Sequence, residues 1–188
     1  MRIISGNLKG KKLNFLNAPS TRPLKDMVRE SIFNTILHSN LINVTIPNSL
    51  VLDIYSGTGS FGIECISRGA SVVNFVEKDK DALKILKENL DKLSINDRTS
   101  VFPIDVQSFF KRKICVEKFD LFFLDPPFSD KDVLMCVNNI KEQKIFKPNN
   151  LVIIHREKDS KEDFNDFLSI IKINTYGRSK IIFGSFYP

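Results

Sequence analysis

The fold is decided by residues 50–62, which read LVLDIYSGTGSFG. The apolar run Leu50–Ile54 is followed three residues later by Gly57, then by Gly59 and Gly62, and an amphipathic stretch comes next. This order is typical of a buried strand that turns sharply into a helix, because glycines let the backbone turn and let a ligand approach without a Cβ in the way. The stretch therefore predicts a strand-loop-helix unit with a ligand at its loop.

Outward from this unit, short apolar runs alternate with amphipathic segments. The runs are Leu50–Ile54, Ser71–Val76, Thr99–Ile104, Phe119–Leu124 and Leu151–Ile154, and helix-like segments lie near residues 60–68, 79–93, 130–141 and 161–168. The alternation predicts an α/β fold with a parallel sheet covered on both faces, since each parallel pair needs a crossover connection. Two strand-like runs between Ile170 and Tyr187 leave no room for a crossover helix, so they predict an antiparallel end to the sheet.

The N-terminal part has a different pattern. Residues 1–16 alternate weakly around Gly6 and Gly10 and predict a hairpin, and Asp26–His38 has the apolar spacing of a helix. With 188 residues, the chain is expected to form one domain, with residues 1–40 as an N-terminal extension and residues 49–188 as the core.

Positive charge is concentrated in this extension. The net charge is +6, of which residues 1–30 hold seven Lys and Arg against two acids. Clustered cations bind polyanions through counterion release, so the extension is expected to bind nucleic acid, although a merely solubilising surface is an equal alternative on charge alone. The candidate RNA-binding residues are Arg2, Lys9, Lys11, Lys12, Arg22 and Arg29.

Other classes of protein are disfavoured by composition. No apolar run approaches the length of about 20 residues that a membrane helix needs, and no signal peptide is visible, so a cytoplasmic protein without a membrane partner is expected. The three cysteines form no C-x-x-C pair, and His38 and His155 are interpreted as structural, so no metal site is expected.

Two cofactors compete for the glycine loop. The three glycines, with Glu77 twenty residues after Gly57, match a dinucleotide fingerprint and favour NAD. Asp53, at the end of the strand, favours S-adenosylmethionine instead, because a carboxylate there suits the cationic amino group of its methionine moiety and repels pyrophosphate. Asp105 follows the third strand, where it either accepts a hydrogen bond from adenine or caps the helix that begins near Gln107.

The most specific motif is Asp125-Pro126-Pro127-Phe128, which follows the strand Phe119–Leu124. Two prolines make a stiff loop whose carbonyl oxygens point outward. Asp125 and the Pro126 carbonyl can accept both hydrogens of an exocyclic amine, and Phe128 offers a ring on which a flipped-out base can stack. The motif predicts methylation of a base amine, and these four residues are the candidate catalytic residues.

The chain resembles the RsmD family of 16S ribosomal RNA guanine-N2 methyltransferases, which are class I enzymes with a motif of this kind. The resemblance rests on residues 1–6, 9–10, 21–23, 28–34, 53–62, 67–70, 76–79, 125–128 and 176–177. It implies a Rossmann-like fold with a mostly parallel seven-stranded sheet and S-adenosylmethionine as the cofactor. It also implies that the partner is 16S ribosomal RNA or the assembling small subunit. The protein itself is expected to be a monomer. Phe128 stands where Tyr is usual, so stacking is kept and a hydroxyl contact is lost.

The expected cofactor contacts follow the ends of the first three strands. They are Asp53, Tyr55, Ser56, Gly57, Thr58, Gly59, Glu77, Lys78, Asp105 and Val106. Two alternatives remain open beside guanine-N2 methylation of RNA. One is a DNA adenine-N6 or cytosine-N4 methyltransferase, which the same acceptors suit, and the other is a non-catalytic cofactor-binding module that recognises RNA.

Overall fold

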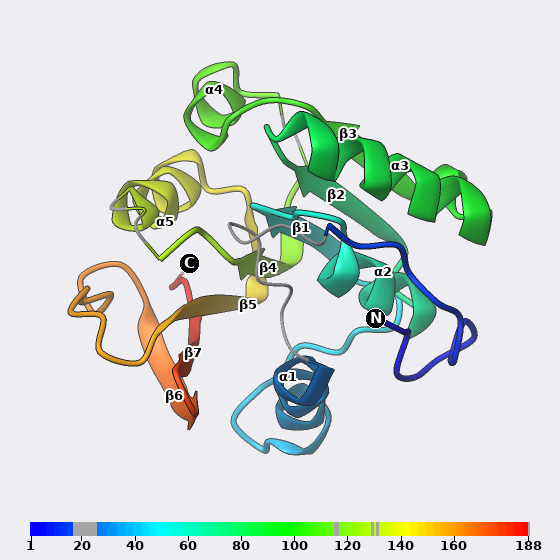
Figure 1. Cartoon of the computed structure of the whole chain (residues 1–188). Coiled ribbons are helices and arrows are strands. Elements are labelled where there is room, and N and C mark those ends of the chain that lie inside the picture. The colour runs from blue at the N-terminus through cyan, green and yellow to red at the C-terminus, as the bar shows by residue number, and fades with distance from the viewer. Residues whose placement is uncertain (17–25, 115–116, 129, 131, 188) are drawn as a thin grey trace.

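The computed structural model describes residues 1–16, 26–114, 117–128, 130 and 132–187. Its strands are β1 (Leu50–Ile54), β2 (Val72–Val76), β3 (Thr99–Phe102), β4 (Phe119–Leu124), β5 (Phe146–Glu157), β6 (Ser169–Tyr176) and β7 (Ser179–Ser185). Across these residues they form a seven-stranded sheet of order β3-β2-β1-β4-β5-β7-β6 (Figure 1). Strands β1 to β5 are parallel, and β7 is antiparallel to β5 and to β6. The predicted α/β sheet with an antiparallel end is confirmed.

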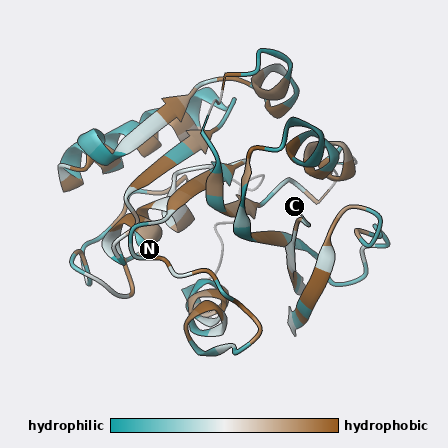
Figure 2. Cartoon of the chain, turned by 180° about the vertical axis from the view of Figure 1, so that it is seen from behind, coloured by the Kyte–Doolittle hydropathy of each residue, from teal (hydrophilic) through white to brown (hydrophobic). Residues whose placement is uncertain are grey.

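Helices cover both faces of the sheet. They are α1 (Asp26–His38), α2 (Ser60–Ser67), α3 (Lys80–Leu93), α4 (Val106–Lys111) and α5 (Val133–Gln143). Because successive strand residues point to opposite faces, Val51 packs with α1, α2 and α3, whereas Leu52 and Ile54 pack with α4 and α5. Figure 2 shows the strands as the apolar centre of the molecule. None of the helices in the described ranges is long and apolar enough to span a membrane.

The sheet register places the ends of the central strands side by side. Ile54 pairs with Leu124, and Leu124 pairs with Ile154. The next residue of each strand, in turn Tyr55, Asp125 and His155, therefore lies at one edge of the sheet. In open α/β sheets this carboxyl edge is where ligands bind.

Three glycines shape the connection from β1 to α2, each for a different reason. Gly57 has a φ of +55° and open space where a Cβ would lie. Gly62 has ordinary backbone angles, but a Cβ there would lie 2.3 Å from the ring of Phe75. Gly59 combines both constraints, with a φ of +82° and a Cβ position 2.4 Å from Leu86 Cδ1. Only glycine meets all these conditions without strain.

The N-terminal arm, residues 1–16, is attached to α2 by a buried acid. Glu64 is completely buried, and its carboxylate accepts hydrogen bonds from the amides of Ile4 and Ser5 at 2.8 and 2.9 Å. The predicted hairpin is present as a short antiparallel pairing: Arg2 lies opposite Lys12, and the amides of Ile3 and Leu13 donate to the carbonyls of Lys11 and Met1. The predicted helix Asp26–His38 has the expected bounds.

One predicted helix is wrong. Residues 161–168 contain a turn and no helix. Asp163 Oδ1 accepts hydrogen bonds from both the backbone amide and the side chain of Asn165, and such local side-chain bonds compete with helical ones. Phe164 and Leu168 are buried all the same, so the apolar spacing reflected packing and not helix.

Candidate active site

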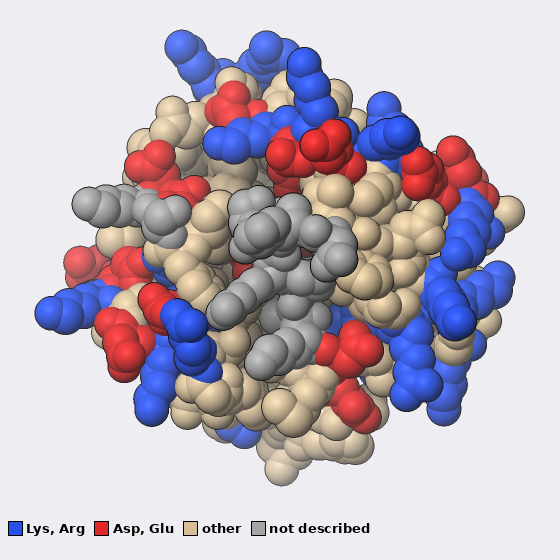
Figure 3. All heavy atoms as spheres, viewed as in Figure 1, with Lys and Arg blue, Asp and Glu red and all other residues tan. Residues whose placement is uncertain are grey.

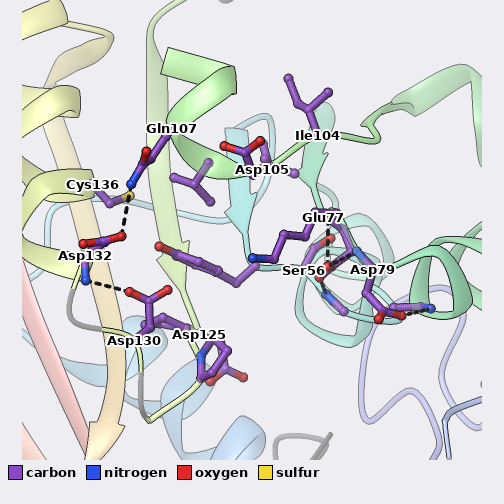
Figure 4. Close-up of a pocket in the computed structure, with 18 of the residues that line it drawn as sticks. Ser56, Glu77, Asp79, Ile104, Asp105, Gln107, Asp125, Asp130, Asp132 and Cys136 are labelled. Carbon is purple, nitrogen blue, oxygen red and sulfur yellow. Dashed lines mark hydrogen bonds between the residues drawn. The ribbon is translucent and has the colours of Figure 1, made fainter. Parts of the chain in front are cut away.

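A cavity of about 900 Å³ opens at the carboxyl edge of the sheet. Its walls come from the glycine loop, the ends of β2 and β3, the loop after β4, the end of β5 and helix α5. In Figure 4, Glu77 and Asp105 lie on one side of the cavity, and Asp125 and Asp130 lie on the opposite side. Twelve predicted site residues line the cavity: Tyr55, Ser56, Gly57, Thr58, Glu77, Lys78, Asp105, Val106, Asp125, Pro126, Pro127 and Phe128.

The cavity is strongly acidic. Six carboxylates line it, namely Glu77, Asp79, Asp105, Asp125, Asp130 and Asp132. Among the described lining residues, Lys78 is the only Lys or Arg. Such a field attracts a cationic ligand or one rich in hydrogen-bond donors and repels pyrophosphate. The site therefore suits a sulfonium cofactor better than the dinucleotide that was its rival.

Glu77 holds the glycine loop through backbone amides. One oxygen accepts from Gly57 N at 2.8 Å, and the other accepts from the amides of Lys78 and Asp79, both at 2.8 Å. The neighbouring Tyr55 has a φ of +61°, a conformation that is uncommon and strained for a residue other than glycine. Glu77 thus ties the end of β2 to a strained turn at the wall of the cavity.

Asp53 lies beneath the loop and is not among the residues that line the cavity. Its side chain is almost completely buried, and Oδ2 accepts a hydrogen bond from Gly62 N at 3.0 Å, while Oδ1 is buried without a partner. Burial raises the pKa of Asp53 well above its usual value, and the nearby carboxylates of Asp125 and Glu77 raise it further. An unpaired buried acceptor is costly, so this oxygen is suited to a cationic group arriving from the cavity.

Asp105 serves as a helix cap in this structure. Its carboxylate accepts from the amide and the hydroxyl of Ser108, at 2.8 and 2.7 Å. These bonds lower the pKa of Asp105. The capping role was one of two alternatives for this residue, and Asp105 lies at the cavity wall at the same time.

Asp125 is held by a histidine from the neighbouring strand. His155 Nδ1 lies 2.8 Å from Asp125 Oδ1, and His155 is buried and also lines the cavity. The ring of Phe128 meets the ring of His155 edge-on at a centroid distance of 5.5 Å. Phe128 is 37% exposed, which leaves part of its ring free to stack on a ligand.

The loop after Asp125 is fixed from behind by Arg156. This buried guanidinium donates to the carbonyls of Pro127, Phe128 and Asp130 at 3.2, 3.3 and 3.1 Å and pairs with Glu162. The expectation that the carbonyls of the proline loop all point outward is therefore wrong for Pro127 and Phe128. Asp125 and the Pro126 carbonyl remain as candidate acceptors for a ligand.

The predicted RNA-binding residues fall into three groups. Arg2, Lys9, Lys11 and Lys12 are exposed on the N-terminal arm, and Figure 3 shows basic side chains gathered on that side of the molecule. Arg22 lies outside the described residues. Arg29 is completely buried, donates to Arg2 O and to Asp26 Oδ1, and lies 4.0 Å from Glu64. Its expected contact with RNA phosphates is wrong for this structure, because the side chain holds the arm from inside.

Sequence reasoning missed His155 and Arg156, and assigned His155 a structural role only. A signal was present, since both follow the buried run Leu151–Ile154, and in a parallel pair the residue after Ile154 lies beside the residue after Leu124. The polar end of β5 is thus adjacent to the Asp125 motif. The contacts of Arg156 with carbonyl groups depend on loop conformation, which periodicity does not encode.

Comparison with known proteins identifies one family. The family described as conserved hypothetical protein 95 matches residues 1–185. The ribosomal RNA small subunit methyltransferase D of Haemophilus influenzae is 34% identical over 178 residues, which are 94% of this chain and 89% of that protein. The protein of the same name from Buchnera aphidicola is 34% identical over 156 residues, which are 83% of this chain and 78% of its own length.

Solved structures share the whole fold. A Streptococcus pyogenes protein described as conserved hypothetical has a TM-score of 0.73 and 26% identity, and covers 84% of this chain and 94% of its own. A hypothetical protein of Thermus thermophilus, at 23% identity, has a TM-score of 0.78 over 97% of this chain and 98% of its own. The similarity to this second structure supports the fold only.

Proposed function

We propose the function of this chain from its family: it belongs to the conserved hypothetical protein 95 family, which is the RsmD family of methyltransferases. The chain is a methyltransferase of ribosomal RNA, and S-adenosylmethionine is its cofactor. Beyond this, we propose that the methylated atom is the exocyclic N2 of a guanine in 16S ribosomal RNA of the small subunit.

The proposal rests above all on how Asp125 is presented. His155 occupies Oδ1 of this carboxylate, so Oδ2 is the oxygen left to accept a hydrogen from a ligand in the cavity. The Pro126 carbonyl beside it supplies a second acceptor, and the half-exposed Phe128 ring lies at the same rim. Two acceptors beside a stacking surface fit a planar base that carries an NH₂ group.

The residues of the cavity fit the cofactor. The backbone at Gly57 is open to a ligand because no atom lies within 4 Å of its Cβ position. Asp53 and Glu77 would hold the amino and ribose groups, and Asp105 and Val106 would lie near the adenine. Asp53 Oδ1 is buried beneath the loop without a partner, and it is the acceptor that we assign to the methionine amino group.

The chemistry of transfer needs positioning more than side-chain reactivity. When bound, the cofactor supplies a methyl group on a cationic sulfur, which is already electrophilic. Asp125 and Pro126 orient the amine so that its nitrogen faces that methyl group. Asp125 Oδ2 would also be the group that accepts the proton that the amine gives up as its nitrogen takes the methyl group.

The N-terminal arm supplies the contacts to RNA in this proposal. Its exposed cations, Arg2, Lys9, Lys11 and Lys12, lie outside the acidic cavity and suit phosphates. The cavity itself would admit the neutral base and repel the phosphate backbone. Ile3 and Leu13 of the arm pack into the same core as the sheet, which supports a single domain. We also propose a monomer that works in the cytoplasm.

The test is methyl transfer to small-subunit RNA and particles from a strain that lacks this protein. The wild-type protein should transfer one labelled methyl group per RNA, and the product nucleoside should be N2-methylguanosine. Replacing Asp125 by Ala should remove most single-turnover activity while cofactor affinity stays nearly normal, because orientation of the amine matters chiefly in the transition state. Replacing Asp125 by Asn should keep part of the activity, because an amide oxygen still accepts one hydrogen bond.

Two results would count against the proposal. Full activity of the Asp125→Ala variant would remove the role of the acceptor pair. A product methylated at adenine N6 or cytosine N4 would keep the chemistry and change the substrate.

A further inference from the structure

The strands β4, β5 and β7 bring three polar side chains into one line, of which the first two line the cavity. Asp125 follows β4, His155 lies in β5, and Ser179 begins β7. His155 Nδ1 lies 2.8 Å from Asp125 Oδ1, and His155 Nε2 lies 2.9 Å from Ser179 Oγ. The histidine is only 7% exposed, so both ring nitrogens are committed to protein partners and not to solvent.

These contacts define which ring nitrogen carries the proton when His155 is neutral. An ionised carboxylate only accepts hydrogen bonds, so Nδ1 must be the N–H donor to Asp125. Nε2 is then an acceptor, and the Ser179 hydroxyl donates to it. A serine hydroxyl can rotate to do so, and a hydrogen bond at one ring nitrogen selects the form of the other.

The same ring supports the stacking residue. Phe128 meets His155 edge-on, at 5.5 Å between centroids and 77° between planes. A shift of His155 would therefore move the acceptor and the aromatic surface together. Arg156, the next residue of β5, holds the carbonyls of Pro127 and Phe128, so two successive residues of one strand support the motif on two sides.

We propose that His155 and Ser179 are a positioning pair for methyl transfer: Ser179 anchors the His155 ring at Nε2, and His155, as an Nδ1–H donor, fixes Asp125 so that Oδ2 faces the target amine. This inference rests on the proposed function. His155 does not touch the substrate in this scheme. It acts through Asp125 and Phe128, so its loss should slow the chemical step and leave cofactor binding unchanged.

The first experiment compares His155→Ala, His155→Asn and Ser179→Ala in single-turnover methylation of small-subunit particles, with cofactor titration for each. His155→Ala should lower the rate about 100-fold, the cost of a small misplacement of reacting groups, with cofactor affinity unchanged within about twofold. His155→Asn should recover most of that loss, because its amide nitrogen takes the place of Nδ1 as a donor. Ser179→Ala should resemble the Asn variant. His38→Asn, at the exposed end of α1, is the matched control and should be fully active.

The second experiment reads the ring directly and does not depend on activity. The chain has two histidines, so ¹⁵N spectra of the wild type and of His38→Asn assign both rings. When the ring is neutral, His155 should carry its proton on Nδ1 and none on Nε2.

Several outcomes would overturn the inference. They are a fully active His155→Ala variant, an Asn variant no better than the Ala variant, and an Nε2–H form of His155. If the wild type transfers no methyl group to RNA, the proposed function fails, while the ring spectrum still decides whether Ser179 and Asp125 fix the histidine.

Discussion

Asp53 is a buried carboxyl group in which the needs of folding and of ligand binding conflict. Its Oδ1 has no donor, and burial is the main reason why its pKa is raised well above the usual value. A carboxyl with a raised pKa stabilises the fold fully below its unfolded pKa, and that contribution is lost as the pH rises through the folded pKa. At neutral pH and above, Asp53 therefore weakens the free protein.

Replacing Asp53 by Asn should stabilise the free protein by about 1–3 kcal/mol at about pH 8, because a neutral amide avoids the cost of burying a charge. The gain should shrink as the pH falls and be smallest well below about pH 4, where the wild-type carboxyl is protonated in both the folded and the unfolded state. Thermal unfolding across this pH range measures the effect. Asp97→Asn, on an exposed acid, is the control.

The same Asp53→Asn change should weaken cofactor binding by about 1.5–3 kcal/mol. Equal cofactor affinity in the wild type and the Asp53→Asn variant would argue against the role of Asp53.

At the scale of single residues, sequence located the site better than it described the contacts. Asp53, Glu77 and Asp105 were expected because acids at strand ends share one sheet edge, and Glu77 and Asp105 do line the cavity. Their hydrogen bonds go to loop amides and to Ser108, which sequence does not specify. Arg29 was misjudged, because a charged residue in a basic segment gives no sign that a buried Glu64 lies beside it.

The three glycines of the loop between β1 and α2 allow a test of two constraints on this element. One constraint is a left-handed backbone, and the other is a lack of space for a Cβ atom. Gly57→Ala should cost about 1–2 kcal/mol of stability, from left-handed backbone strain alone. Gly62→Ala should cost about 1–3 kcal/mol, from overpacking alone, against Phe75 and Val73. Gly59→Ala should cost more than either change. Urea unfolding of the three variants ranks them, and a Gly59→Ala variant as stable as Gly57→Ala would mean that Leu86 moves aside freely.

Most elements were predictable because their apolar periodicity matched their final burial. Leu50–Ile54 and Phe119–Leu124 have the expected bounds, since both are short buried runs flanked by polar residues. Residues 161–168 were misread because Phe164 and Leu168 are spaced as on a helix while Asp163 closes a turn. Strand β5 extends beyond the predicted run on both sides, because its partners β4 and β7 supply ladder bonds that pattern alone does not reveal.

At the scale of the whole molecule, charge is divided between the acidic cavity and the basic arm. Replacing Lys9, Lys11 and Lys12 together by Glu should weaken RNA binding and reduce the salt dependence of its affinity by about one unit of slope per lysine. Cofactor affinity should not change. RNA affinity across a salt series provides the measurement.

The control for this arm variant is an equal change of charge elsewhere. Lys158, Lys161 and Lys172 are exposed and belong to the β5–β6 part of the chain, which Figure 1 places away from the N-terminal arm. Their reversal to Glu should leave the slope closer to that of the wild type. Equal slopes in the two triple variants would show that only net charge matters.

The order of strands in the sheet also affects how the chain is made. Strand β7 lies between β5 and β6, yet β6 precedes it in the chain. During translation β6 therefore emerges before the strand that joins it to the sheet, and β5 meanwhile keeps an open edge with unpaired backbone groups. Open edges are sites of aggregation in nascent chains. Between the synthesis of β6 and of β7 the partly made chain therefore has an open sheet edge that the finished fold covers.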